Sequence, residues 1–189
     1  MKKLLVLAFI LTGIFYTAKA QDESEDPQKG FDKSKLFFGG NFALNFGNIT
    51  IVNVSPQVGY RFSRLFAAGA GINGQYSSFR RPRVDGSTYS RENYGVAGLN
   101  IFGRVYPIDQ ILLQVQPEMN YTWGKFKQFN VGEQKLEGKF VPSVLLGAGG
   151  VIPTGRGAFL AMVQYDILQN ARTPYGNRVF YNFGYNLGF

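Results

Sequence analysis

The segment Val179-Phe180-Tyr181-Asn182-Phe183-Gly184-Tyr185-Asn186-Leu187-Gly188-Phe189 decides the fold prediction. Every odd-numbered position carries a large apolar or aromatic side chain, and most even-numbered positions carry Asn or Gly. Because successive side chains of a β-strand point to opposite faces, the segment predicts a strand with one apolar face and one small, polar face. No residue after Phe189 covers the apolar face, so we expect lipid to cover it.

The same alternation recurs along the chain. In the clearest example, Val52, Val54 and Val58 alternate with Asn53 and Gln57. The eight alternating segments are 36–47, 50–62, 65–76, 94–106, 111–124, 139–152, 158–168 and 179–189. They predict an all-β protein in which residues 36–189 form an eight-stranded antiparallel up-and-down transmembrane β-barrel.

Alternation alone also fits a soluble barrel that turns its apolar face inward around a ligand. Volume separates the two alternatives, because the interior of an eight-stranded barrel is only just wide enough to be filled by side chains. The apolar faces carry many rings, which would overfill that interior: Phe38, Phe42, Tyr60, Phe66, Trp123, Phe159, Tyr181 and Phe183. We therefore predict that the rings face lipid and that Gly, Asn, Gln and Ser fill the lumen.

The connections alternate in length. Those at 63–64, 107–110 and 153–157 are short, whereas those at 77–93, 125–138 and 169–178 are longer and more polar; a tight hairpin near 47–48 is the exception. This rhythm is typical of bacterial outer-membrane barrels with both termini in the periplasm and long extracellular loops. Pro56, Pro117 and Pro142 fall in mid-strand on the predicted lipid face, where each should weaken the strand or mark a bulge.

The N-terminus predicts export. Met1-Lys2-Lys3 is a basic start, 4–16 is a short apolar run, and Ala18-Lys19-Ala20 fits a signal-peptidase site, so residues 1–20 are predicted to be a signal peptide. Residues 21–35 form an acidic, polar stretch without periodicity, interpreted as a flexible periplasmic lead-in. The chain has no Cys, which excludes a lipid-anchored lipoprotein and any disulfide.

Composition narrows the function classes. Without residues 1–20 the chain carries 17 basic and 12 acidic residues, an excess too small to indicate nucleic-acid binding. The absence of His and Cys removes an imidazole base, a thiol nucleophile and a soft metal site. We therefore expect no enzymatic activity, no metal and no cofactor.

The chain resembles the small eight-stranded outer-membrane β-barrels, in particular the type common in Bacteroidota. The resemblance rests on the signal peptide, the strand number, a recurring Pro-x-Val/Met-Gly/Asn-Tyr pattern, the strand end Gly103-Arg104-Val105-Tyr106 and the terminal Phe189. It implies that the barrel-assembly machinery recognises the last strand through Tyr185, Leu187 and Phe189. Members of this group share a fold rather than a function.

Four charged residues are predicted to face the lumen: Arg61, Arg104, Glu118 and Asp166. Ionisable groups at membrane depth need partners and often have a function. One interpretation is a neutral network that plugs the lumen, and the other is a gate whose re-pairing opens a narrow path. A second candidate is the cluster Arg80, Arg81 and Arg83, which is either solvated loop charge or a site for lipopolysaccharide phosphates or an acidic partner.

The sequence thus favours a monomeric, non-catalytic barrel with a structural or surface-binding role and a lumen filled by polar side chains. Its expected partners are outer-membrane lipid, lipopolysaccharide and the assembly machinery. The alternative is a narrow conduit for small solutes across the outer membrane. The two hypotheses differ in whether the lumen is open.

Overall fold

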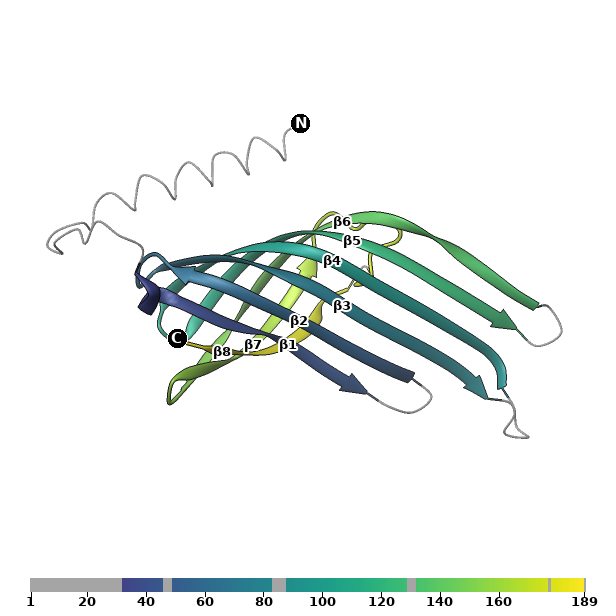
Figure 1. Ribbon diagram of the computed structural model, residues 1–189, viewed down its shortest axis with the longest axis horizontal. Coiled ribbons are helices and arrows are strands. Elements are labelled where there is room, and N and C mark those ends of the chain that lie inside the picture. The colour runs from purple at the N-terminus through teal and green to yellow at the C-terminus, as the bar shows by residue number, and fades with distance from the viewer. Residues whose placement is uncertain (1–31, 46–48, 83–87, 129–131, 177, 189) are drawn as a thin grey trace, which may run out of the picture. The chain divides into compact units, whose positions relative to one another are not determined.

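The structure, a computed structural model, describes residues 32–45, 49–82, 88–128, 132–176 and 178–188 (Figure 1). The predicted signal peptide (1–20), the tight hairpin at 47–48, Arg83 and Phe189 lie outside these residues, as does all of the lead-in up to residue 31. From Lys33 onward the chain forms one compact unit.

Eight antiparallel strands form a closed up-and-down barrel in which each strand pairs with its neighbours in sequence and β1 pairs with β8. A single 3-10 turn at Lys33–Lys35 precedes the first strand. The strands are β1 (Leu36–Asn45), β2 (Ile49–Arg61), β3 (Phe66–Pro82), β4 (Thr88–Ile108), β5 (Ile111–Gln128), β6 (Gly132–Thr154), β7 (Gly157–Asp166) and β8 (Phe180–Leu187). The all-β, eight-stranded prediction is confirmed. Within the described residues, no helix is long and apolar enough to cross a membrane.

The strands present the faces that their alternation predicts. Phe42, Tyr181 and Phe183 point outward and are 61%, 73% and 63% exposed, whereas Gln57 and Asn120 point inward and are buried. The outer surface is therefore almost continuously apolar, because its side chains belong to alternate positions of every strand.

The two ends of the barrel differ. At the short-turn end, β2–β3, β4–β5 and β6–β7 are joined by brief turns. At the other end β3–β4 and β5–β6 continue as paired hairpins far beyond β1, β7 and β8 (Figure 1). Strands β3 to β6 contain 17 to 23 residues, against 8 to 10 in β1, β7 and β8.

The predicted long loops at 77–93 and 125–138 are therefore wrong in their bounds. The ladders run on to Pro82↔Thr88 and to Gln128↔Gly132. Apolar alternation reports a difference in burial between two faces, and it vanishes where both faces of a hairpin meet solvent. Cross-strand contacts hold these extensions instead, including the ring pair Phe79–Tyr94 and the ion pair Lys125–Glu133.

The three mid-strand prolines all lie on the outer face, as predicted. None produces a bulge, because the pairing register is the same on both sides of Pro56, Pro117 and Pro142. Ladder pairs are missing around Pro56, where Ser55 and Pro56 have no partner in β3, and around Pro117, where Gln116 and Pro117 have no partner in β4. The expectation of weakened pairing holds there, and the expectation of a bulge does not.

The lumen has two layers, which corrects the prediction of a uniformly polar filling. At the short-turn end an apolar layer is fully buried: Phe37, Ala67, Phe102, Tyr106, Leu112, Val151, Ala158, Leu160 and Met162. Above it the lumen is lined mainly by amide, hydroxyl and charged side chains, with the buried apolar residues Val96, Val141 and Leu145 among them. The volume argument still holds, because the rings inside are few.

Glycines make room for the enclosed rings. A Cβ built on Gly59 would lie 2.2 Å from the Phe37 ring, and one on Gly69 would lie 2.5 Å from the Phe102 ring and 2.3 Å from the Val58 carbonyl. The inward positions 59 and 69 therefore carry glycine, and the space that their side chains would occupy holds the rings of Phe37 and Phe102. This is how an eight-stranded interior accommodates an aromatic layer.

We expect Gly69→Ala to destabilise the barrel by about 1–3 kcal/mol, the usual effect of overpacking. The matched control is Gly103→Ala, where the nearest atoms to a new Cβ lie 3.7 and 3.9 Å away. The measurement is urea unfolding of the detergent-folded protein. Equal unfolding midpoints for the two variants would contradict the packing account.

Candidate functional site

Arg104 is fully enclosed in the lumen, with 1% of its surface exposed. Its Nε donates to Gln114 Oε1 at 2.6 Å and its Nη2 to Gln57 Oε1 at 2.9 Å. In the orientation of the Asn186 amide in which its nitrogen donates to the Tyr185 carbonyl, its oxygen accepts a hydrogen bond from Arg104 Nη1 at 2.9 Å. Arg104 thereby ties its own strand β4 to β2, β5 and β8 across the lumen.

The same guanidinium covers the apolar layer. Its carbon lies 4.3 Å from the centre of the Phe102 ring and 5.7 Å from that of Phe37. Arg61 lies similarly over Tyr106, at 4.9 Å. The flat face of a guanidinium can stack on an aromatic ring while its N–H groups donate hydrogen bonds at its edges. Arginine can therefore contact both the aromatic layer and the amides above it.

A row of amides leads from Arg104 to Glu118 along one face of β5. Gln114 Nε2 donates to Gln116 Oε1 at 2.7 Å, and Gln116 Nε2 donates to Glu118 Oε2 at 3.3 Å. Each amide accepts on the Arg104 side and donates on the Glu118 side, so all dipoles point the same way. Hydrogen bonds arranged in such a chain strengthen one another.

Glu118 collects further donors from β3 and from its own strand β5. Asn73 Nδ2 lies 2.9 Å from Oε2, and Asn120 Nδ2 lies 2.7 Å from Oε1. The Tyr175 hydroxyl also hydrogen-bonds to this carboxylate. Glu118 is thus held by β3, β5 and the segment 167–179 that connects β7 to β8.

Asp166, the last residue of β7, organises that connecting segment. It accepts from the backbone N–H groups of Val144 and Leu168, at 3.2 and 3.1 Å, and from Thr173 Oγ1 at 2.7 Å. Thr173 also lies 3.3 Å from Ser143 Oγ in β6. The carboxylate therefore pulls the segment inward as soon as the strand ends.

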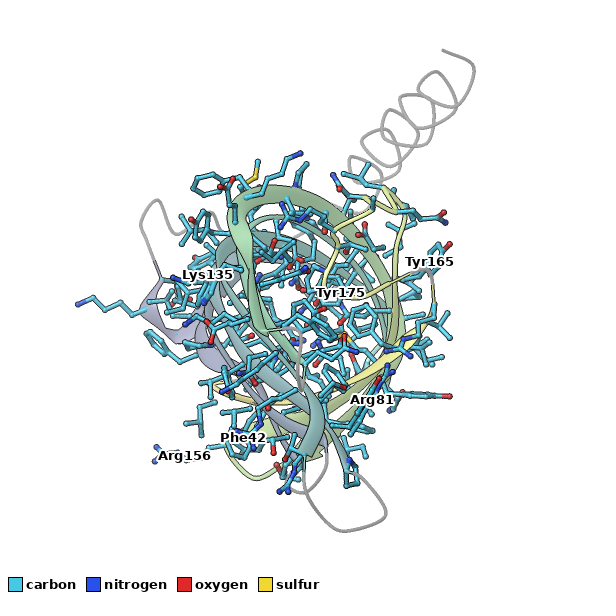
Figure 2. All side chains as sticks on the ribbon, turned by 90° about the vertical axis from the view of Figure 1, so that its right-hand side faces the viewer. Phe42, Arg81, Lys135, Arg156, Tyr165 and Tyr175 are labelled. Carbon is cyan, nitrogen blue, oxygen red and sulfur yellow. The ribbon has the colours of Figure 1, made fainter. Side chains whose placement is uncertain are left out.

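Segment 167–179 closes the lumen at the long-hairpin end. Figure 2, seen from that end, shows Tyr175 inside the ring of strands. Tyr175 stacks flat on Phe180 with the ring centres 4.5 Å apart, and Arg172 Nη2 donates to the Glu137 carbonyl at 2.8 Å. The segment is thus anchored at its start, middle and end.

The four predicted lumen charges do face inward, but they do not form one network of ion pairs. Within the described part of the chain, no ion pair joins Arg104 to Glu118 or Asp166. The amide row connects Arg104 to Glu118, whereas Asp166 binds backbone and Thr173. Sequence reasoning missed Tyr175 and Thr173 because nothing in a polar loop marks the residues that fold back inside.

The predicted arginine cluster is divided by the structure. Arg80 and Arg81 are neighbours on β3, so they lie on opposite faces, and Arg81 faces inward to Glu92 at 3.8 Å. Arg80 faces outward directly opposite Arg91, which is opposite Lys127. With Lys125 and Lys135, which are also paired across strands, these residues form a row that we call the basic band.

The basic band lies on the outer face of the long hairpins, next to exposed rings of the same face. Those rings are Tyr76, Tyr121, Trp123 and Phe140. Glu133, bound to Lys125 at 3.3 Å, is the acid paired directly opposite Lys127. In the last strand, Tyr185 packs on Phe159 and Leu187 is exposed on the outer face.

Among the described residues, no three Asp, Glu, His or Cys side chains are grouped so as to hold a metal ion.

We expect Arg104→Met to lower the free energy of unfolding by about 2–5 kcal/mol, since three buried amides lose a charged donor. The control Arg156→Met, in the exposed β6–β7 turn, should change it by no more than about 0.5 kcal/mol. Fluorescence of the single Trp during urea unfolding measures both. Similar values for the two variants would show that the Arg104 bonds contribute nothing net.

No protein-family model and no curated protein sequence matches this chain.

Proposed function

We propose that this protein is a non-catalytic β-barrel of the bacterial outer membrane, with a lumen closed at both ends, whose protruding hairpins bind the phosphate groups of surrounding lipid. The observation that carries the proposal is the basic band, placed beside a belt of exposed rings on the outer face. Both carboxylates of the lumen are engaged by several donors, which favours a structural role over catalysis.

The outer surface supports a lipid environment. Large apolar side chains are exposed on every strand, far beyond the patch that a soluble monomer presents. A tilted strand crosses a bilayer with about 9–11 residues. Strands β1 and β7, with 10 residues each, have that length, while β4 and β6 have 21 and 23 and must project beyond it.

The projecting part defines the orientation we propose. Protruding hairpins suit the extracellular side, so the short turns and both ends of the barrel segment face the periplasm. Aromatic side chains prefer the interface between hydrocarbon and head groups. Tyr76, Tyr121 and Trp123 would lie at that level, which places Arg80, Arg91 and Lys127 among the phosphates.

Charge supports lipid phosphate as the partner. Arg80 and Arg91 are directly opposite each other on the outer face, which brings two guanidinium groups together there. Arginine binds phosphate with two parallel N–H groups. We propose that lipopolysaccharide supplies this phosphate, and that the assembly machinery recognises the outward-facing Tyr185 and Leu187 together with Phe189.

The closed lumen argues against the conduit alternative. The apolar layer fills the short-turn end, and segment 167–179 fills the other. We expect no conductance across planar lipid bilayers from the wild type or from Arg104→Met. Stepwise currents in the wild type would contradict a closed lumen, and currents in Arg104→Met alone would identify Arg104 as a gate.

The basic band is tested by Arg80→Ser/Arg91→Ser. Each cation near a lipid surface contributes about 1 kcal/mol, so the double variant should bind fluorescent lipopolysaccharide roughly thirtyfold more weakly in neutral detergent. The control Lys33→Ser/Lys35→Ser removes the same charge beside the start of β1, at the short-turn end. Equal losses in both variants would indicate unspecific attraction and would refute the site.

A further inference from the structure

The barrel wall has an incomplete seam between β1 and β8. The two strands pair only from Phe38↔Leu187 to Asn41↔Gly184. Yet β1 stays paired to β2 as far as Asn45, and β8 stays paired to β7 back to Phe180. Beyond Asn41 and Gly184 the two strands are therefore present but separate, and their ends diverge in Figure 1.

Such a seam needs an occupant in a membrane. Backbone N–H and C=O groups that lack a strand partner cannot be satisfied by hydrocarbon. Breaks of two residues interrupt the β2–β3 ladder at Ser55-Pro56 and the β4–β5 ladder at Gln116-Pro117, and pairing resumes on both sides of each. The seam is the longest stretch of the described wall along which two neighbouring strands continue without pairing to each other.

A cavity of about 270 Å³ opens at this seam. Its lining includes inward-facing Asn41 and Asn182 and also outward-facing Phe42 and Phe183. Residues from both faces of two adjacent strands therefore line one cavity, beside the stretch where these strands do not pair. This arrangement points to a passage between the polar lumen and the outer surface.

The inner wall of the cavity offers hydrogen-bond donors. Asn53 Nδ2 and Gln75 Nε2 each donate one hydrogen bond inside the lumen, and each has a second N–H. Gln116 also lines the cavity. Arg178 supplies a positive charge at the edge, and none of the described lining residues is Asp or Glu. Donors with one cation and no carboxylate favour an anionic head group.

The size of the cavity limits what enters. Pockets that enclose a whole ligand usually measure about 300–1,000 Å³. At about 270 Å³ this one holds a head group and its first carbons. A longer hydrocarbon chain would leave through the seam, past the exposed rings of Phe42, Tyr181 and Phe183.

We propose that the seam between β1 and β8 is a lateral entry for an anionic amphiphile, which places its carboxylate or phosphate head in the lumen and leaves its chain in lipid. The inference rests on the proposed membrane location. It is distinct from the basic band, which lies on the hairpins of β3 to β6.

The test uses the protein folded into phosphatidylcholine bilayers with spin-labelled stearate, whose motional restriction is measured by electron spin resonance. Spin-labelled methyl stearate is the uncharged control, and spin-labelled lysophosphatidic acid distinguishes a phosphate from a carboxylate head. We expect the wild type to prefer one or both anions over the ester. Arg178→Gln should reduce the preference about tenfold, as expected for one charge-assisted hydrogen bond, and Arg156→Gln should not.

A reversible closure tests the route. Phe42→Cys/Phe183→Cys in this cysteine-free chain should lose the preference in its cross-linked fraction and regain it on reduction. The control pair Phe38→Cys/Leu187→Cys, in the joined part of the seam, should retain it.

The possible failures are separable. Equal restriction of stearate and its ester by an inserted barrel, or unchanged selectivity after cross-linking of the Phe42/Phe183 pair, would overturn the lateral entry alone. If no probe is restricted at all, the protein does not insert, and the proposed membrane location fails as well.

Discussion

The small volume inside a ring of eight strands is the constraint on which the rest of the structure depends. Alternate residues of every strand must enter that space, and only a few can be large. Rings enter where Gly59 and Gly69 leave room, and elsewhere Asn, Gln and Ser fill the lumen. The remaining large apolar side chains have to face outward, which gives the barrel the apolar exterior on which the proposed lipid environment rests.

Filling the lumen with polar groups creates a second requirement, since buried donors and acceptors must be paired. In the amide row, a chain of hydrogen bonds connects the Arg104 cation to the Glu118 carboxylate, although these two charged groups do not touch. Tyr175 and Thr173 add hydrogen bonds to Glu118 and Asp166 from the connection between β7 and β8. The same bonds that satisfy the carboxylates also close the barrel, so stability and closure have one origin.

Unequal strand heights divide the surface into two regions with different chemistry. Where β3 to β6 rise above their neighbours, cross-strand pairing gathers Arg80, Arg91 and Lys127 on one outer face. Where β1 and β8 stop pairing, a cavity lies beside the amide donors of Asn53 and Gln75 and beside Arg178. Both features carry the proposals of anionic lipid partners, the first for phosphate groups at the membrane surface and the second for a head group that enters from the side.

The sequence by itself determined the strand number, the face of each side chain and the inward position of Arg104, Glu118 and Asp166, because a period of two is a local property of the chain. It missed the extended hairpins, since solvent on both faces removes the alternation. It also could not show that Arg80 and Arg81 separate, that Arg104 reaches Glu118 through Gln114 and Gln116, or that Tyr175 folds inside. Only the tertiary structure decided these points, because register, strand height and ring closure depend on which distant residues pair, and local pattern carries no record of that.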